Sequence, residues 1–257
     1  MSLQSKGEAD GMMQDDIYTN RDLTALYDAL NPARDDTEFY LHIAGPAKRI
    51  LDLGCGTGLL ACMLSARGHN VTGVEPAGEM LDIARHRKGG GGVTWIEGDA
   101  RLLKLEQSFD LVIMTGHVFQ VFLTDDDVRA VFKTAFEHLG KGGRLIFESR
   151  NPLAKAWEDW TPERTGKTIS VEGVGEVTVQ HRLISVDADL VSFATDHTFH
   201  RTGKTIVNGS TLRFLLQTEI EQRLYAAGFS KTIWYGDWHQ GPVQTTSQEL
   251  IVVAERN

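Results

Sequence analysis

Residues 50–58 read Ile-Leu-Asp-Leu-Gly-Cys-Gly-Thr-Gly, and this stretch decides the fold. An apolar run typical of a buried strand ends there in three alternate glycines, and a helical pattern over residues 59–66 follows at once. Glycine allows a sharp turn and leaves the backbone bare, and the N–H groups at a helix start are open to a ligand. The stretch therefore predicts the strand–turn–helix unit of a doubly wound α/β fold, with a ligand at the turn.

Two details of the turn indicate which ligand it holds. The glycines follow the pattern G-x-G-x-G and not G-x-G-x-x-G, because position 59 is Leu59. Asp52 lies two residues before the first glycine, where its charge would repel a pyrophosphate. We therefore expect Gly54, Cys55 and Gly56 to contact a ligand with positive charge. S-adenosylmethionine (SAM) has two such charges, a sulfonium and an ammonium.

A second acidic residue follows the next expected strand at the spacing of a nucleoside site. Residues 70–74 form a short β-type run that ends in Glu75, about twenty residues after the turn. A carboxylate at this place accepts hydrogen bonds from both ribose hydroxyls, in NAD as well as in SAM. Pro76 then opens a helix in which Met80 is placed to pack on an adenine.

Three further strand patterns continue the alternation of strands and helices. The run at 93–97 leads to Asp99 and Ala100, and we expect the Asp99 carboxylate to accept a hydrogen bond from the adenine amino group. Residues 109–114 form a buried strand, and residues 139–147 form a helix end, a tight turn and another strand. The loop after the buried strand supplies three candidates: Thr115, Gly116 and His117.

Taken together, these pieces resemble the class I SAM-dependent methyltransferases. The matching segments are LDLGCGTG, GVEPAGEML, IEGDA, FDLVIM and LGKGGRLIF, in this order over residues 50–149. The resemblance implies a doubly wound, seven-stranded Rossmann-like sheet with SAM as the cofactor. The residues expected to bind the cofactor are Asp52, Gly54, Cys55, Gly56, Glu75, Pro76, Met80, Asp99, Ala100, Thr115, Gly116 and Tyr27.

The C-terminal segments indicate the class of acceptor. STLRFLLQTEIEQRLYAAGF, YGDW and ELIVVAERN resemble a broad group of small-molecule methyltransferases, which implies transfer to N or O of a small molecule. The chain lacks the Asn/Asp-Pro-Pro-Tyr/Phe signature of enzymes that methylate exocyclic nitrogens of bases, and it lacks the Pro-Cys nucleophile of C5 pyrimidine methylation. Relatives in the group carry Asn in place of His117 and His near Val121, so their catalytic assignment is not transferred.

Composition limits the partners and the location. The chain has 257 residues, of which 24% are charged and 41% hydrophobic, enough for one α/β domain and an insertion. Its net charge of −9 disfavours a nucleic-acid substrate. Cys55 and Cys62 have neither disulfide nor metal spacing, and no apolar run reaches the length of a membrane span. We expect a cytoplasmic protein without metal or membrane contact.

The chain divides into four expected parts. Residues 1–46 are expected to form a helical cap over the cofactor cleft, with helical patterning over residues 16–46 that breaks at Asn31-Pro32. Residues 47–151 form the SAM-binding core. Residues 152–216 alternate in polarity between turn signals, which predicts an inserted antiparallel sheet that roofs the acceptor pocket. Residues 217–257 return to the core with a helix that Thr218 is expected to cap, and with the last two strands, one of them antiparallel. The four-glycine run at 89–92 is expected to be a flexible loop.

His117 and Arg213 are the catalytic candidates. His117 follows the fourth strand, beside the expected methyl position, and imidazole is a suitable base because its ordinary pKa is about 6.5; the same residue is equally suited to cap a helix. Arg213 faces opposite to its two apolar neighbours and either lines the pocket or pairs with a surface acid. Arg150 and Asn151 follow the fifth strand, where Asn151-Pro152 also suits a simple turn.

Other polar and aromatic residues have simpler explanations. Trp157 and Trp160 are expected in packing or in the contact of a possible homodimer. Trp238 and His239 lie in a loop that is expected to reach the cleft edge. Four residues on alternating strands are not expected to be metal ligands, and most of them are expected to be solvated or hydrogen-bonded within the sheet: His181, Arg182, His197 and His200.

Two other functions stay open at this point. A domain of this kind can bind SAM without turnover, and a nicotinamide-dependent oxidoreductase uses a similar sheet. The inserted sheet over the cleft favours an enzyme over a binding module. Binding of SAM rather than NAD distinguishes the methyltransferase from the oxidoreductase.

Overall fold

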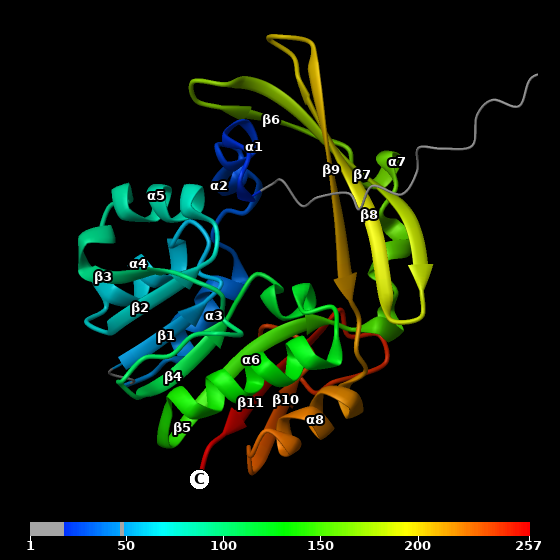
Figure 1. The fold of residues 1–257 in the computed structure, drawn as a ribbon. Helices are drawn as coiled ribbons and strands as arrows, with labels where there is room; N and C mark the ends of the chain where they lie inside the picture. The colour runs from blue at the N-terminus through cyan, green and yellow to red at the C-terminus, as the bar shows by residue number, and fades with distance from the viewer. Residues whose placement is uncertain (1–17, 47–48) are drawn as a thin grey trace, which may run out of the picture.

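The computed structural model describes residues 18–46 and 49–257. A seven-stranded sheet with helices on both faces forms the core, and a four-stranded antiparallel sheet lies at one end of it (Figure 1). The predicted α/β fold with an inserted antiparallel sheet is confirmed. Residues 1–17 of the expected N-terminal cap lie outside the described residues.

The order of the core strands creates the position for a site. The strands are β1 (Arg49–Leu53), β2 (Asn70–Glu75), β3 (Val93–Glu97), β4 (Phe109–Met114), β5 (Leu139–Arg150), β10 (Lys231–Tyr235) and β11 (Glu249–Glu255). Their order is β10-β11-β5-β4-β1-β2-β3, and β11 runs antiparallel to both neighbours, as predicted. The chain moves outward from β1 to β3 and returns on the other side of β1 as β4. Doubly wound sheets bind ligands beyond the carboxyl ends of the strands at such a reversal.

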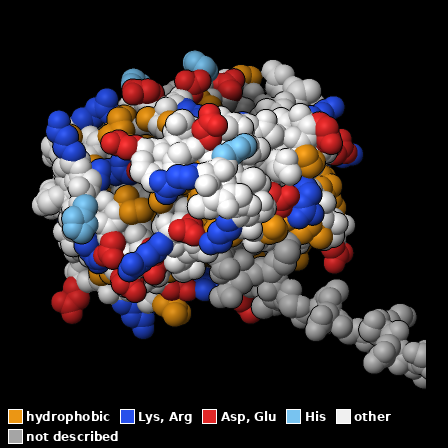
Figure 2. All heavy atoms as spheres, turned by 90° about the horizontal axis from the view of Figure 1, so that it is seen from above, with side chains coloured by type: hydrophobic (Ala, Val, Ile, Leu, Met, Phe, Trp, Pro, Cys, Tyr) orange, Lys and Arg blue, Asp and Glu red, His pale blue; other side chains and the backbone are white. Residues whose placement is uncertain are grey.

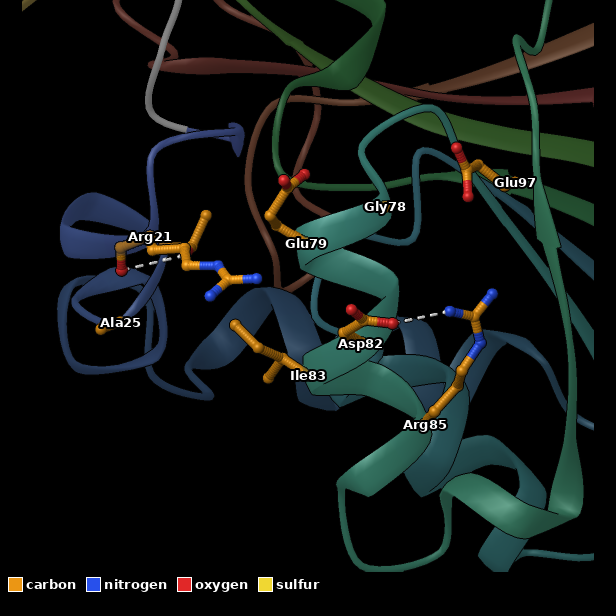
Figure 3. Close-up of a pocket in the computed structure, with 9 residues that line it drawn as sticks. Arg21, Ala25, Gly78, Glu79, Asp82, Ile83, Arg85 and Glu97 are labelled. Carbon is orange, nitrogen blue, oxygen red and sulfur yellow. Dashed lines mark hydrogen bonds and ion pairs between the residues drawn. The ribbon is translucent and has the colours of Figure 1, made fainter.

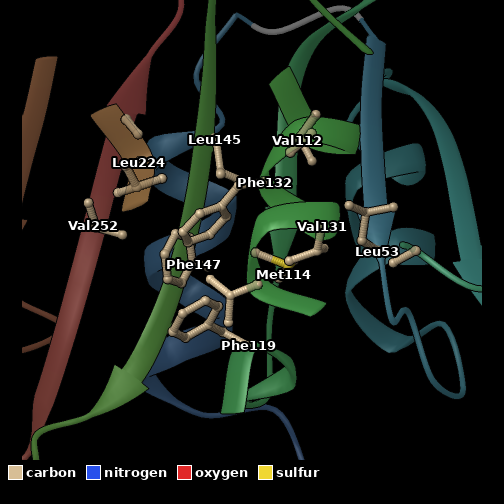
Figure 4. Close-up of a cluster of buried hydrophobic side chains, with 14 of the residues drawn as sticks. Leu53, Val112, Met114, Phe119, Val131, Phe132, Leu145, Phe147, Leu224 and Val252 are labelled. Carbon is tan, nitrogen blue, oxygen red and sulfur yellow. The ribbon is translucent and has the colours of Figure 1, made fainter. Parts of the chain in front are cut away.

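Alternate residues of each strand pack on opposite faces of the sheet. Leu51 and Leu53 of β1 belong to the core under α6 (Asp125–His138) and α8 (Gln217–Ala226), whereas Ile50 packs under α3 (Asp35–Ile43) and α4 (Leu59–Ala66). Figure 4 shows the first of these cores, in which Phe119 stacks on Phe132 with 5.3 Å between ring centres. Each fully buried side chain of this size stabilises the fold by about 1.5–3 kcal/mol.

The N-terminal helices join the core to the inserted sheet. Helices α1 (Arg21–Thr24) and α2 (Tyr27–Leu30) are short, and the chain breaks at Asn31-Pro32 before α3, as predicted. Leu23 and Leu26 are buried in a cluster with β7 and β8 side chains of the inserted sheet. The inserted strands are β6 (Lys167–Val171), β7 (Gly175–Asp187), β8 (Leu190–Phe199) and β9 (Lys204–Arg213), paired in that order.

Two local predictions are wrong. Leu216, not Thr218, precedes the first residue of α8, and its N–H donates to Glu219 Oε2 at 2.8 Å. The glycine run after α5 (Gly78–His86) is not a loose loop: residues 90–92 form a 3₁₀ turn, and the buried Gly90 accepts a hydrogen bond from Trp95 Nε1 at 2.9 Å. The other short helices are η3 (Val118–Val121), η4 (Pro152–Ala154), η5 (Ala156–Asp159) and α7 (Pro162–Thr165).

No helix between residues 18 and 46 or between 49 and 257 is long and apolar enough to cross a membrane. Over the same ranges, no group of three or more His, Cys, Asp or Glu side chains is arranged to hold a metal ion.

Candidate active site

Two adjoining cavities lie beyond the carboxyl ends of β1 and β4. The larger has a volume of about 380 Å³ and the smaller about 260 Å³. Phe193, Ser210 and Leu212 of the inserted sheet form part of the wall of the larger cavity. Both cavities are lined by the same six residues: Tyr27, Gly54, Gly56, Gly116, His117 and Arg150.

A groove of greater volume, about 570 Å³, lies elsewhere, between α1 and α5. Figure 3 shows that Arg21 and Ala25 lie on one side of it and that Glu79, Asp82 and Ile83 lie on the other. None of the residues expected to bind the cofactor or to act in catalysis lines this groove. Size alone does not identify the site, and the cavities at the strand ends carry the candidate chemistry.

The glycine turn is fixed by packing on both sides. A Cβ on Gly54 would lie 2.7 Å from Val118 Cγ2, and a Cβ on Gly58 would overlap the Trp95 ring. Both glycines also have positive φ, +76° and +74°, which L side chains rarely adopt. Gly54 and Gly56 line the cavities, so part of this backbone faces a ligand while Gly58 serves packing.

Glu75 ties the glycine turn to the end of β2. Its Oε2 accepts a hydrogen bond from the Gly56 N–H at 3.0 Å, and its Oε1 accepts one from the Ala77 N–H at 3.1 Å. Burial raises the pKa of Glu75, and these two N–H donors oppose that rise. Because each carboxylate oxygen has a second lone pair, Glu75 can also accept hydrogen bonds from a ligand in the larger cavity.

Asp52 lies behind the turn with an unsatisfied charge. The side chain is buried, and its Oδ1 has no hydrogen-bond partner among the described residues. Burial, with the added charges of Glu75 and Glu148, raises the pKa of Asp52 to about 7. A cation near the turn would offset this cost, so the residues present fit a ligand with an ammonium or sulfonium group. Asp52 does not line either cavity, and its contact with the cofactor stays a prediction.

Met80 and Asp99 differ in how they meet the cavities. Met80 is 1% exposed and lines neither cavity, because its side chain fills the space under the glycine turn. The predicted packing of Met80 on an adenine stays a prediction. Asp99 does line the larger cavity, where Arg101 donates to its carboxylate from Nε at 3.0 Å and lowers its pKa.

The remaining expected cofactor residues divide between the two cavities. Pro76 and Ala100 line the larger cavity, and Cys55 and Thr115 line the smaller one. Burial raises the pKa of the Cys55 thiol far above its ordinary value, so Cys55 is not a thiolate nucleophile.

His117 lies where the two cavities meet, in a network that the sequence did not predict. Its ring Nε2 is 3.0 Å from Glu249 Oε2, and its backbone N–H donates to Glu148 Oε1 at 2.7 Å. Tyr40 donates its hydroxyl to the other oxygen of Glu148. His117 has φ +62°, a left-handed conformation that these contacts hold. The one sequence signal for Glu148 is an acid directly after the apolar run at residues 145–147.

Arg150 lies at the end of β5 and lines both cavities. Its Nη1 donates to Gln120 Oε1 at 3.0 Å, and its guanidinium carbon lies 5.8 Å from the Trp160 ring centre. Asn151, by contrast, is a turn residue: it accepts from the Leu153 N–H at 3.1 Å.

Arg213 is not at the candidate site, and its catalytic prediction is wrong. Its Nε lies 2.7 Å from Asp189 Oδ2 and its Nη2 lies 2.8 Å from Asp125 Oδ1. It lines neither cavity, because the alternation of β9 turns its neighbour Leu212 inward instead. Arg213 joins the inserted sheet to α6, which is the ion-pair alternative that the sequence left open.

The aromatic and histidine predictions have mixed outcomes. Trp157 and Trp160 pack on Phe214 and Phe193 with 4.7 Å and 4.5 Å between ring centres. Trp238 packs on Phe39 and, with His239, lines a separate pocket, so the predicted reach to the cleft edge is wrong. Hydrogen bonds within the inserted sheet join His181 to Thr195, Arg182 to Asp196 and His200 to Thr178. His197 is the exception, because it is buried with both ring nitrogens unpartnered among the described residues.

Comparison with known proteins decides the family. A family model described as a methyltransferase domain matches residues 50–143. The cypemycin N-terminal methyltransferase of Streptomyces sp is 27% identical over 213 residues, which cover 81% of this chain and 83% of that protein. Residues 50–143 thus match a methyltransferase domain, and the resemblance to the class I SAM-dependent methyltransferases is confirmed.

Further comparisons agree with this resemblance. A putative methyltransferase of Geobacillus sp. (strain WCH70) is 38% identical over 104 residues, 40% of this chain and 42% of that protein. The SAM-bound structure of CalS10, an amino pentose methyltransferase from Micromonospora echinaspora, has a TM-score of 0.69 at 25% identity and covers 90% of this chain and 97% of that one. The CcbJ methyltransferase from Streptomyces caelestis shares the fold, with a TM-score of 0.77 at 22% identity over 95% of this chain and 99% of that one. SAM is the cofactor of this methyltransferase.

Proposed function

We propose that this methyltransferase moves a methyl group to a nitrogen or oxygen of a small molecule held between residues 115–120 and the inserted sheet. The observation that carries the proposal is the position of His117 at the junction of the two cavities, opposite inserted-sheet residues such as Phe193 and Leu212. A volume of about 380 Å³ suits a metabolite, since small-molecule pockets span about 300–1,000 Å³.

The proposed cofactor contacts follow from the cavity walls. The backbone at Gly54 and Gly56 faces the ligand, Glu75 accepts from the ribose hydroxyls, and Asp99 accepts from the adenine amino group. Asp52 lies behind the turn, and its charge favours a cationic ligand without a contact in the cavity wall. SAM supplies an electrophilic methyl group on a sulfonium, a good leaving group.

His117 is proposed to take the proton of the acceptor. When Nε2–H donates to Glu249, the other ring nitrogen, Nδ1, keeps a lone pair for that proton. Glu249 acts as a positioning residue, because its charge holds the ring and stabilises the imidazolium that forms. The protein otherwise contributes alignment and exclusion of water, worth roughly 7–11 kcal/mol in favourable systems.

The acceptor class rests on the relatives and on the charge of the chain. The matched proteins named above include the cypemycin N-terminal methyltransferase and an amino pentose methyltransferase, which favours an amino group as the acceptor. The net charge is −9, and Figure 2 shows basic and acidic side chains interspersed over one face, without the basic area that a nucleic acid needs. A cytoplasmic location and a homodimer stay predictions.

Transfer of a labelled methyl group from SAM to a library of small amines and alcohols tests the proposal. We expect turnover with a subset of acceptors, and no turnover with duplex DNA or RNA. Binding of SAM without turnover on any acceptor would favour the module without catalysis. A higher affinity for NAD than for SAM in calorimetric titration would favour the oxidoreductase.

A further inference from the structure

The Arg150 guanidinium has no acidic partner in the described part of the chain. No Asp or Glu of residues 18–46 or 49–257 lies within ion-pair distance of it, and its side-chain hydrogen bond goes to the neutral amide oxygen of Gln120 at 3.0 Å. Burial lowers the pKa of Arg150, which reports the cost of keeping this charge out of water. A neutral amide offsets only part of that cost.

The nearby acids are occupied elsewhere. Glu249 lies directly opposite Arg150 in the β5–β11 ladder, yet its carboxylate is turned to His117 at 3.0 Å. Glu148, two residues before Arg150, accepts from the Tyr40 hydroxyl and from the His117 N–H. Both carboxylates thus have other hydrogen-bond partners, and the Arg150 guanidinium faces the cavities.

The surroundings of Arg150 fit a ligand that has an apolar part and a carboxylate. The wall of the larger cavity near the inserted sheet is mostly apolar: it includes Phe193, Leu212 and Phe122, with Ser210 as its polar member. Trp160 holds the guanidinium at 5.8 Å from its ring centre, which restricts the orientation of the planar group. A planar guanidinium in a fixed orientation matches a carboxylate, which it binds through two parallel N–H donors.

We propose that Arg150 binds a carboxylate of the acceptor, and that the acceptors are small amines or alcohols with an apolar body and one carboxylate. This rests on the proposed function, because it places the acceptor in the larger cavity. Arg150 also lines the smaller cavity, so the carboxylate of the cofactor itself is the competing ligand. Arg34 lines only the smaller cavity and has no ion pair in the described chain, which makes it the better partner for the cofactor carboxylate.

Binding to the complex with S-adenosylhomocysteine tests the proposal without turnover. Benzoate and benzamide, which have the same ring and differ in charge, are titrated calorimetrically into the wild type, Arg150→Met and Arg150→Lys. We expect benzoate to bind the wild type roughly 10- to 100-fold more tightly than benzamide, the range for hydrogen bonds to a charged group. Arg150→Met should abolish this preference, and Arg150→Lys should keep part of it.

Arg34→Met is the matched control. We expect it to weaken S-adenosylhomocysteine while the benzoate preference persists, and we expect Arg150→Met to do the reverse. Equal binding of benzoate and benzamide to the wild type, or no binding of either, would overturn the proposal. Loss of S-adenosylhomocysteine binding in both Arg150 variants would also overturn it, by assigning Arg150 to the cofactor. Because no step requires methyl transfer, failure of the catalytic proposal is seen separately, in the turnover assay.

Discussion

Glu249 Oε2 lies 3.0 Å from His117 Nε2, although 132 residues separate the two in the chain. The contact exists because β11 runs antiparallel beside β5 and starts at the strand end where His117 follows β4. A carboxylate in this position selects the Nε2–H form of the ring and fixes its orientation. Through this pair, a residue of the antiparallel strand β11 takes part in the proposed proton transfer.

Replacement of Glu249 by Gln should lower kcat and leave cofactor affinity unchanged. The amide keeps the shape but removes the charge that stabilises the imidazolium, so we expect a loss of roughly tenfold to hundredfold, at the low end for acid–base catalysis. Steady-state kinetics with a confirmed acceptor and calorimetry with S-adenosylhomocysteine measure the two effects. Glu255→Gln on the same strand is the control and should change neither. An unchanged kcat in Glu249→Gln would remove Glu249 from the mechanism.

Glu75→Ala should weaken SAM by about 1–3 kcal/mol, the cost of leaving polar groups unpaired. The variant loses the proposed ribose contact and leaves the Gly56 and Ala77 N–H groups without their acceptor. Glu75→Gln keeps one acceptor oxygen and should lose less. Calorimetric titration with SAM gives both values. The same affinity in wild type and Glu75→Ala would place the ribose elsewhere.

Asp52 should make stability depend on pH between about 4 and 7. Its pKa is about 7 in the folded protein and about 3.9 in the unfolded chain, so the folded state binds the proton more tightly. The contribution of Asp52 to the free energy of unfolding is therefore highest below about pH 4. It falls as the pH rises and is constant above about pH 7. Asp52→Asn should gain roughly 1–3 kcal/mol relative to wild type between pH 5 and pH 8.

Urea unfolding of both proteins at several pH values measures this difference. The neighbouring acids Glu75 and Glu148 titrate in both proteins, so their contributions largely cancel in the comparison. Parallel stability curves for wild type and Asp52→Asn would contradict the raised pKa of Asp52.

Arg213→Ala should lower stability rather than chemistry. The side chain is 11% exposed and pairs with Asp189 and Asp125, so its loss removes the link between the inserted sheet and α6. We expect a loss of about 1–3 kcal/mol, the range for hydrogen bonds to charged groups, with kcat preserved per folded molecule. Thermal unfolding and active-site titration separate the two. A strong loss of kcat in fully folded variant would return Arg213 to the catalytic candidates.

Gly58→Ala should destabilise the fold more than Gly68→Ala. Both positions have positive φ, +74° and +88°, so both substitutions carry the same backbone cost of about 1–2 kcal/mol. A Cβ at position 58 also overlaps Trp95, whereas a Cβ at position 68 meets nothing within 4 Å. Denaturant unfolding of the two variants isolates the packing part. Equal losses would show that Trp95 moves aside freely.

The sequence predicts the parts of this molecule that are local. The strand before Gly54, the acid at Glu75 and the hairpins of the insertion follow from periodicity and turn chemistry, and the structure has them. Strand β6 is missed because it is a mostly exposed edge strand, so its five residues show little apolar alternation. Edge strands of this kind take their structure from pairing with a neighbour rather than from their own composition.

The candidate site is predicted only in part because half of it is assembled by distant segments. The glycine turn and His117 belong to short motifs that can be read directly. Glu148 and Glu249 come together through sheet order. The register of β9 decides between the two alternatives for Arg213, because it determines which face of the strand meets the cavity. No single-sequence pattern encodes that register.

A crystal structure of the complex with S-adenosylhomocysteine tests the central claim most directly, because it locates the sulfur that carries the methyl group in SAM. We predict that the nucleoside lies against Glu75 and Asp99, and that the sulfur faces the larger cavity beside His117. The near-attack distance for transfer is about 3–3.5 Å, so the acceptor atom would then lie between the sulfur and the inserted sheet. A sulfur that faces away from His117, or a ligand bound in the groove between α1 and α5, would contradict the account.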